Sequence, residues 1–218
     1  MTIPLAATAH LEPRNAPDSG RSSLRQTGLM PQAPLSTARL LLTPLAPEHL
    51  DHEIELDTDP QVMRYLFNGR PRPRADIVEA HHRRLVVAQD HPGLGYWTGF
   101  LDGAFVGWWV LLPVLDDGVA RPDEAEVGYR LLPRFWRQGL ASEGSIALLH
   151  QAFTGLGLQR VIAQTMAVNE ASRATMSKIG LRYLRTFHET WDEPIAGYEH
   201  GEVEYAVSRD EWLAKHPA

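Results

Sequence analysis

A short stretch of the chain has the residue types of a loop that binds an anion. It runs from Trp136 to Glu143 (W-R-Q-G-L-A-S-E) and joins a strand-like segment, 126–132, to apolar residues at helical spacing, Ile146, Ala147, Leu149 and Phe153. Such a loop directs free backbone N–H groups and the positive end of the helix dipole at one point. Gly139 and Ala141 leave the backbone open to a ligand. The sequence therefore predicts an anion site, suited above all to a pyrophosphate, with plain helix packing as the alternative.

A second segment whose residues could take part in binding or catalysis begins about thirty residues further on. Asn169 and Ser172 stand at the start of an expected helix, 172–179, where an N-cap residue and its third helical neighbour belong. Capping alone would explain both residues. The chain contains neither G-x-x-x-x-G-K-[ST] nor G-x-G-x-x-G, so the better-known phosphate loops are excluded.

Together the two segments resemble the GNAT N-acetyltransferases, which use acetyl-coenzyme A. The phosphate loop of that family reads [QR]-x-x-G-x-[GA], and residues 136–141 match it except at the first position, where Trp136 stands. Trp followed by G-x-A-[ST]-E is similar to the branch that acetylates ribosomal-protein N-termini. That branch carries N-x-x-S-x-x-x-x-x-K-x-G-[FL], matched by Asn169, Ser172, Lys178, Gly180 and Leu181. It opens with T-x-R-L-x-L, matched by Thr37, Arg39, Leu40 and Leu42, so the resemblance covers roughly residues 37–212.

The resemblance implies an N-acetyltransferase that moves acetyl from acetyl-coenzyme A to a primary amine by direct attack in a ternary complex. The amine would belong to a protein N-terminus or a small molecule. The resemblance implies these cofactor-binding residues: Leu131, Leu132, Arg134, Arg137, Gln138, Gly139, Leu140, Ala141, Ser142, Asn169 and Ser172. In it, Asn169 bonds the pantetheine arm and Ser172 faces the thiolate. The usual acid is a tyrosine, but Met176 occupies its position, so the acid is Ser172 or a water.

A general base is expected because a protonated amine has no lone pair with which to attack a thioester. Alternation along 124–128 puts Glu124, Glu126 and Gly128 on one face of a strand. Many GNAT enzymes have a carboxylate at the position of Glu126, although a solvated side chain is the plainer interpretation. His188 and Glu189, expected on a strand 183–191, form the competing pair, with an exposed edge pair as their alternative.

Two further functions remain open on the sequence. A non-catalytic GNAT-like module that binds acyl-coenzyme A for regulation is favoured by Met176, whereas the intact loop and Asn169 favour the enzyme. A binder of another nucleotide through Gly139 is the third. Arg130, Arg134 and Arg137 all fall near the loop, where they are expected to attract an anion or else to be solvated surface arginines.

Composition limits the function classes. The 218 residues are 44% hydrophobic and 22% charged, with no apolar run near the length of a membrane span and no signal-peptide pattern at the start, so a cytoplasmic protein is expected. Zero cysteines exclude disulfides and thiolate ligands. The net charge of −6 argues against nucleic acid and suits a cationic amine. Histidine spacing, as in His81-His82 and His49-x-x-His52, predicts no metal site. A monomer and a homodimer both remain open.

The elements that must position these residues follow from periodicity. Residues 1–36, with five prolines and no apolar period, predict a disordered arm, and 37–218 predict a single acetyltransferase domain. Strands are expected at 39–43, 96–101, 104–111, 124–132, 160–168, 183–191 and 202–207, and helices at 47–56, 59–66, 74–90, 140–155 and 172–179. This order predicts an α/β (α+β) fold with a mixed, mostly antiparallel sheet and helices on both faces. The amine pocket is expected between 57–74 and a loop, 113–123, while Trp97, Trp108 and Trp109 are expected to pack the core.

Overall fold

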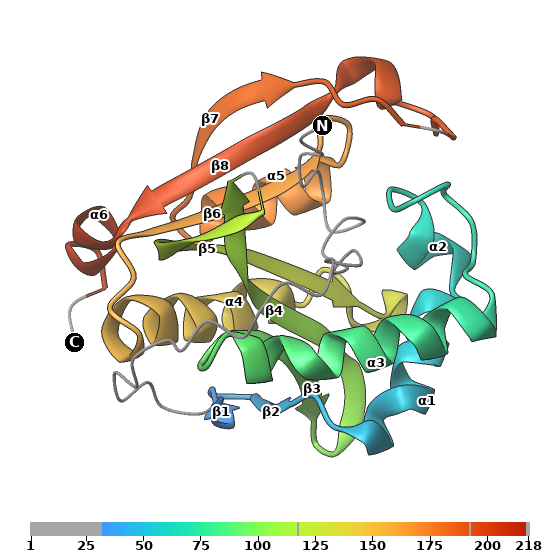
Figure 1. Ribbon diagram of the computed structural model, residues 1–218, viewed down its shortest axis with the longest axis horizontal. Coiled ribbons are helices and arrows are strands. Elements are labelled where there is room, and N and C mark those ends of the chain that lie inside the picture. Colours follow the sequence, from blue (N-terminus) through green and yellow to red (C-terminus); the bar gives the residue numbers. More distant parts are fainter. Residues whose placement is uncertain (1–31, 117, 192, 217–218) are drawn as a thin grey trace.

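The computed structural model describes residues 32–116, 118–191 and 193–216, which form one sheet with helices on both of its faces (Figure 1). The strands are β1 (Leu35–Ser36), β2 (Leu40–Pro44), β3 (Gly95–Leu101), β4 (Ala104–Asp116), β5 (Val119–Leu131), β6 (Arg160–Met166), β7 (Arg182–Phe187) and β8 (Glu202–Ser208). The helices are α1 (Leu50–Asp57), α2 (Pro60–Met63), α3 (Arg74–Asp90), α4 (Leu140–His150), α5 (Glu170–Lys178) and α6 (Arg209–Leu213).

The sheet has the strand order β1-β2-β3-β4-β5-β6-β8-β7. Every neighbouring pair is antiparallel except β5 and β6, which run parallel and are joined through α4. The predicted mixed and mostly antiparallel sheet is confirmed. The single parallel pair lies in the middle of the sheet, where it divides a five-stranded part from a three-stranded part.

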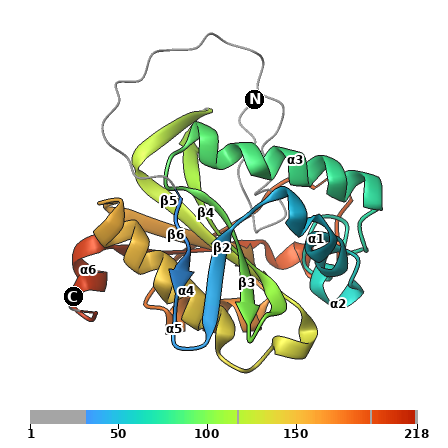
Figure 2. The ribbon, with the colours of Figure 1, turned by 90° about the horizontal axis from the view of Figure 1, so that it is seen from below.

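Adjacent tryptophans on β4 show how the two layers are built. Successive side chains of a strand point to opposite faces, so Trp108 and Trp109 enter different cores. Trp109 packs with Leu148 and Phe153 beneath α4, while Trp108 packs with Leu56 and Val87 from α1 and α3. Both indole rings are buried, which confirms their predicted packing role. Figure 2 shows α4 and α3 on opposite sides of the sheet.

A glycine sets the distance between α4 and the sheet. A Cβ atom added at Gly144 would lie 2.4 Å from the ring of Trp109, which is far closer than atoms can approach. The same ring donates from Nε1 to the carbonyl oxygen of Ala141 at 3.1 Å. The first turn of α4, where the predicted anion site begins, is therefore fixed directly onto β4.

Local signals predicted several elements correctly. The helix at 74–90 has the predicted bounds. Asp102 and Gly103 both have positive φ values, 49° and 79°, as a tight two-residue hairpin requires. Asp59 caps the next helix by accepting from Gln61 N, but that helix ends at Met63 rather than at residue 66.

Other predictions of local structure were wrong. The expected loop 113–123 is mostly strand, because β4 and β5 continue into a long hairpin with Leu115 opposite Ala120. β7 ends at Phe187, so His188 and Glu189 follow the strand rather than lie on it. Residues 32–36 belong to the fold instead of to a disordered arm: Leu35–Ser36 pairs with β2. A two-residue strand has no period that a sequence pattern could detect. Residues 1–31 of the expected arm lie outside the described residues.

Candidate active site

The centre of the site is the place where β5 and β6 stop pairing. The two strands pair over three rungs only, and the last rung joins Glu126 and Ile162. β5 continues to Leu131 and β6 to Met166 with no further pairing between them. The backbone groups of β5 beyond Glu126 on this side are therefore not committed to β6.

The loop that follows β5 delivers a helix start without a side-chain cap. Gly139 is the N-cap residue of α4, with a φ of 80°, and it has no side chain that could accept a hydrogen bond from the first turn. Arg137 also has a positive φ, 59°, which is uncommon for a residue with a side chain. Trp136 Nε1 donates to Leu131 O at 2.7 Å and so ties the loop to the end of β5. The predicted anion site thus has backbone donors available.

Two cationic side chains approach this helix start. A Cβ atom at Gly139 would lie 3.7 Å from Lys178 Nζ and 3.8 Å from Arg39 Nη2. Arg39 Nη2 also donates to Gln138 O at 3.2 Å, and Gln138 Nε2 donates to Arg134 O at 2.9 Å. The remaining residues implied by the resemblance lie at the end of β5 or in the first turn of α4: Leu131, Leu132, Leu140, Ala141 and Ser142.

The motif Thr37-x-Arg39 holds one of these cations in place. Glu143 of α4 accepts from Thr37 Oγ1 at 2.6 Å, from Arg39 N at 2.9 Å and from Arg39 Nε at 2.7 Å. Partial burial acts to raise the pKa of Glu143, but the hydrogen bonds from Thr37 and Arg39 outweigh it and hold this pKa below its usual value. The turn before β2 is therefore clamped to α4 beside the helix start.

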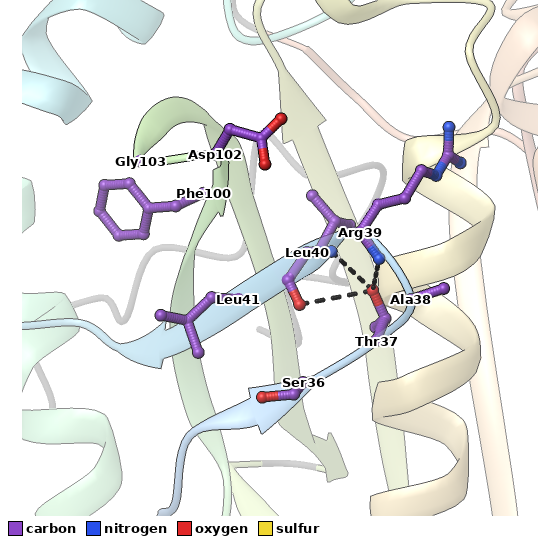
Figure 3. Close-up of a pocket in the computed structure, with 9 residues that line it drawn as sticks. All are labelled: Ser36, Thr37, Ala38, Arg39, Leu40, Leu41, Phe100, Asp102 and Gly103. Atoms are coloured by element: carbon purple, nitrogen blue, oxygen red, sulfur yellow. Dashed lines mark hydrogen bonds between the residues drawn. The ribbon is translucent and has the colours of Figure 1, made fainter.

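A pocket of about 420 Å³ adjoins this clamp. It lies between the β1–β2 turn and the β3–β4 hairpin, with Phe100 and Asp102 on the hairpin side (Figure 3). Arg39 lines the pocket, but its side chain extends away from Phe100 (Figure 3). The pocket therefore lies beside the proposed anion site and is separate from the parting of β5 and β6.

Of the three arginines expected around the loop, Arg130 lies elsewhere. Its side chain is buried on the opposite face of the sheet, where its guanidinium pairs with Asp57 of α1. Alternation explains the difference, because Arg130 shares a strand face with Glu126 rather than with the residues beneath α4. Arg134 pairs with Glu55 at 2.7 Å on the surface. The expectation that all three surround the anion site was wrong for Arg130.

Glu126 is a deeply buried carboxyl group beside the parting strands. Its side chain is 2% exposed and points away from Ala125 and Val127, which join the core beneath α4. Burial, followed by the charges of Glu204 and Glu189, raises the pKa of Glu126 to about 8. A carboxyl group with this pKa can exchange protons with an amine at mildly alkaline pH.

The competing base lies in the same neighbourhood. Glu189 follows β7, and its charge contributes to the raised pKa values of both Glu126 and Glu202. Burial is the main cause for Glu202, whose pKa is also about 8. Glu202 and Glu204 were missed on the sequence, although two carboxylates at alternate positions of an apolar strand were a usable signal. His188 packs near Gly201, with its Nε2 atom 3.0 Å from the position of an added Cβ.

The start of α5 combines the capping role with a hydroxyl pair. Asn169 Oδ1 accepts from Ser172 N at 3.3 Å, so the predicted cap is confirmed, and Asn169 Nδ2 donates to Thr165 Oγ1 at 3.0 Å. Met176 is buried in the core and has no proton to donate. No sequence pattern indicated Tyr129, whose hydroxyl lies 3.1 Å from Ser172 Oγ.

Two classes of feature are not found in the described part of the chain. No group of three or more His, Cys, Asp or Glu side chains there is arranged to hold a metal ion. His52 instead stacks on Phe105, with ring centroids 4.5 Å apart, and His81 Nδ1 lies 2.8 Å from Glu53 Oε2. Within residues 32–116, 118–191 and 193–216, no helix is long and apolar enough to cross a membrane.

Comparison with known proteins decides the family. A family model described as an acetyltransferase (GNAT) domain matches residues 39–182. The chain belongs to the GNAT acetyltransferase family. It is also 44% identical over 185 residues to the Aspergillus fumigatus protein named FsC-acetyl coenzyme A-N(2)-transacetylase, covering 84% of this chain and 79% of that protein.

Solved GNAT structures share the fold at low sequence identity. A Bacillus anthracis GNAT acetyltransferase has a TM-score of 0.66 at 22% identity, covering 81% of this chain and 99% of that one. A spermidine N-acetyltransferase from Vibrio cholerae, in complex with CoA and spermine, has a TM-score of 0.66 at 16% identity, with coverage of 81% and 99%. The ribosomal L7/L12 alpha-N-protein acetyltransferase RimL, in complex with coenzyme A, has a TM-score of 0.66 at 18% identity, with coverage of 82% and 98%.

These comparisons confirm the GNAT resemblance seen in the sequence. The protein is an acetyl-coenzyme A-dependent N-acetyltransferase of the GNAT family, a family that acts on amines.

Proposed function

We propose that this GNAT acetyltransferase transfers acetyl to a primary amine, on a small molecule or a protein N-terminus, by direct attack within a ternary complex. The observation that carries the proposal is the position of Glu126. It occupies the last rung at which β5 pairs with β6, and its carboxyl group has a pKa raised to about 8. A proton acceptor therefore lies where the sheet opens, on the face away from α4.

The residues present fit a coenzyme A phosphate at the start of α4. The helix start has no side-chain cap, and both Arg39 and Lys178 reach within about 4 Å of the space above Gly139. Backbone N–H groups, the helix dipole and two cations would all favour an anion there. In this proposal Arg39 and Lys178 replace Arg130 as the cations of the site.

The parting of β5 and β6 offers a path for the pantetheine arm. Backbone groups of β5 beyond Glu126 are not paired with β6 and can bond the amides of the arm. Asn169 uses one amide hydrogen on Thr165 and has a second hydrogen that can donate to a pantetheine carbonyl. Ser172, in the first turn of α5, then lies on the side of the leaving sulfur.

The proposed reaction needs one proton acceptor and one proton donor. The substrate ammonium gives a proton to Glu126, directly or through one water, and its nitrogen then forms a bond to the acetyl carbon. The carbon–sulfur bond breaks and the electron pair stays on sulfur, which takes up a proton. The second proton lost by the nitrogen leaves to solvent, so the balance is one amide, one thiol and one released proton.

Two observations bear on the acceptor. Glu126 and Glu202 are buried on one sheet face with pKa values raised to about 8, and a positively charged amine would stabilise their ionised forms. The Aspergillus fumigatus relative is named for transfer to a nitrogen, N(2). Both support an amine nitrogen as the group that is acetylated.

The test is thiol release from acetyl-coenzyme A with a panel of amines that includes amino-acid amides, diamines and peptides with free N-termini. Glu126→Gln should lower kcat by about 10²-fold or more, the usual contribution of a positioned base. Coenzyme A affinity should be unchanged. Glu124→Gln is the matched control, because Glu124 shares the strand face but pairs with Arg121 and Arg160 at the surface.

The pH dependence separates the assignments. With a pKa of about 8 for Glu126, kcat/KM should rise with pH through this value and then level off. High pH should partly rescue Glu126→Gln, because more of the amine then arrives deprotonated. Full activity in Glu126→Gln together with a loss in Glu189→Gln would move the base to Glu189. Coenzyme A binding without thiol release for any amine would contradict amine acetylation and favour a module that only binds acyl-coenzyme A.

A further inference from the structure

A tyrosine from the sheet reaches the helix residue that faces the leaving sulfur in the proposed function. The hydroxyl of Tyr129 lies 3.0 Å from the carbonyl oxygen of Ser172 and 3.1 Å from its Oγ atom. Tyr129 is on the part of β5 that no longer pairs with β6. It lies three positions after Glu126, so the two side chains point to opposite faces of the strand. The two groups therefore border the strand opening from opposite sides.

The position of this phenol compensates for a residue that α5 lacks. Met176 stands where the family usually has its acid, one helical turn after Ser172 and on the same face of α5. Its thioether is buried in the core. Tyr129 approaches that face from the strand below, with its hydroxyl close to Ser172 and Thr175. A phenol is thus supplied by β5 in place of one on the helix.

We propose that Tyr129 is a positioning residue that acts through Ser172, as the second member of a proton relay to the leaving thiolate. The proposal rests on the proposed acetyl transfer. When the carbon–sulfur bond breaks, Ser172 Oγ gives its proton to sulfur and takes the proton of the Tyr129 hydroxyl. Tyr129 then recovers a proton from solvent. The solvent has received the second proton of the substrate nitrogen, and Glu126 also releases its proton there before the next turnover, so no other reactant is needed.

The surroundings of Tyr129 keep it in the donor form. Burial raises the pKa of Tyr129 to about 12, against weaker lowering by hydrogen bonds with Ser172 and Thr175. The hydroxyl therefore carries its proton throughout the pH range of an enzyme assay. It can bond either the carbonyl oxygen or the Oγ atom of Ser172, and a negative sulfur would favour the arrangement in which Tyr129 donates to Oγ and Ser172 donates to sulfur.

The decisive experiment is a double-mutant cycle on kcat for thiol release. Tyr129→Phe should lower kcat at least tenfold, near the low end of the rate contribution that a positioned proton donor makes. The KM for acetyl-coenzyme A and the affinity for coenzyme A should stay unchanged. In the Ser172→Ala background the same change should alter kcat less than twofold, because the relay is already broken. Tyr183→Phe is the matched control, since its hydroxyl bonds Thr186 on the exposed strand β7.

A second readout distinguishes proton transfer from packing. In mixtures of light and heavy water, the wild-type rate should follow a curved proton inventory, and Tyr129→Phe should make it linear. An equal loss of kcat from Tyr129→Phe in both backgrounds would show a structural role and overturn the proposal, as would full activity in Tyr129→Phe. If that variant fails to fold, fluorotyrosine placed at residue 129 keeps the shape and lowers the pKa, and an unchanged rate would likewise overturn the relay. A wild type that acetylates no amine would instead refute the proposed function itself.

Discussion

Buried carboxyl side chains on the side of the sheet away from α4 fall into two groups. Asp57 has arginines beside it that compensate its negative charge, whereas Glu126 and Glu202 form the uncompensated group. Asp57 is fully buried, and burial alone would raise its pKa, yet the charges of Arg130 and Arg84 lower it below the usual value. Glu126 and Glu202 are each 2% exposed, and burial raises the pKa of both to about 8. Equal burial thus has opposite consequences, depending on whether cations accompany the carboxylate.

The two groups therefore have different roles: Asp57 stabilises the fold, and Glu126 is proposed to take part in the reaction. The pairs of Asp57 with Arg84, Arg72 and Arg130 join α1 to α3, to the segment before α3 and to β5. Among the described residues no cation pairs with Glu126, and burial with the charges of Glu204 and Glu189 disfavours its ionised form. A carboxyl group with such a raised pKa is suited to act as the base for an ammonium group. The ion pairs of Asp57 thus hold α1 and α3 to the sheet, whereas Glu126 lies at the proposed reaction centre.

Glu204 shows that two carboxylates of one strand can differ in whether a cation lies beside them. It lies two residues from Glu202 on β8 and on the same face. Its Oε2 atom accepts from Arg185 Nη2 at 2.8 Å and from Gln164 Nε2 at 3.1 Å. Glu202 Oε2 has no hydrogen-bond partner within the described ranges. One β8 carboxylate is thus held by cation and amide donors, while its neighbour is not.

The largest effect on stability is expected when the carboxylate of Asp57 is removed from its arginine partners. Asp57→Asn would remove the buried carboxylate that pairs with Arg130 and Arg84, although Arg84 keeps its ion pair with Glu53 at 2.9 Å. The loss of this buried charge should lower the unfolding free energy by about 3–5 kcal/mol. Urea denaturation at pH 7 measures it. Glu55→Gln is the control, because Glu55 forms a surface pair with Arg134 and should cost no more than about 1 kcal/mol. A similar small loss in Asp57→Asn would mean that the buried pairs do not support the fold.

The next effect concerns the two cations beside the proposed phosphate site, Lys178 and Arg39, of which Arg39 also pairs with Glu143 at 2.6 Å. Gly139→Asp would place a carboxylate beside Lys178 and Arg39, where a coenzyme A phosphate is proposed. Coenzyme A affinity should fall by at least about 10²-fold, or about 2.7 kcal/mol, measured by calorimetry. Gly157→Asp is the control, since its φ of 71° is similarly strained and nothing lies within 4 Å of its added Cβ. Equal loss of affinity in both variants would remove Gly139 from the site.

A smaller effect should appear when the uncompensated group is neutralised. The pKa of Glu202 is raised in the folded state, so the folded protein binds a proton that the unfolded chain has released above pH about 4.5. The unfolding free energy should therefore fall as pH rises from about 4.5 through about 8. Glu202→Gln removes this slope and should be more stable than wild type at pH 9, on the order of 2 kcal/mol, but not at pH 4. Denaturation of wild type, this variant and the surface control Glu199→Gln at several pH values measures it. Equal pH slopes for Glu202→Gln and wild type would contradict the raised pKa.

The comparison also explains what could be predicted from the sequence. The hairpin at Asp102-Gly103 and the cap at Asn169 were predicted because their signals lie within a few residues. The order of strands and helices followed from the same local periodicity. By contrast, Arg130 finds Asp57 across 73 positions of chain, and no local pattern indicates that pairing.

The residues of the candidate site likewise divide into those that a local sequence pattern could indicate and those that it could not. The helix start at Gly139 and the carboxyl group at Glu126 could be named because a loop pattern and a strand alternation pointed to them. Tyr129 could not, since its partner Ser172 lies 43 positions away and only the departure of β5 from β6 brings them together. The extended hairpin over 113–123 was also missed, because cross-strand pairing outweighs the prolines at 113 and 122.

The smallest effect on the unfolding free energy is expected at Glu143, a partly exposed carboxylate that pairs with Arg39. Its dependence on pH should be opposite to that of Glu202. Hydrogen bonds from Thr37 and Arg39 lower the pKa of Glu143 below its ordinary 4.5, so this carboxylate stabilises the folded state above that pH, and the contribution is lost as pH falls through the lowered pKa. Glu143→Gln should cost no more than about 1 kcal/mol at pH 7, because the pair is partly solvated. The loss should shrink on acidification, whereas the gain from Glu202→Gln grows on alkalinisation. Glu79→Gln, which removes a surface pair with Arg83 on α3, is the control for charge removal alone. Denaturation of the three proteins from pH 3 to pH 7 measures the slopes. A loss in Glu143→Gln that stays constant over this range would show that its shape matters rather than its charge, and the contrast between compensated and uncompensated carboxylates would then end at the buried groups.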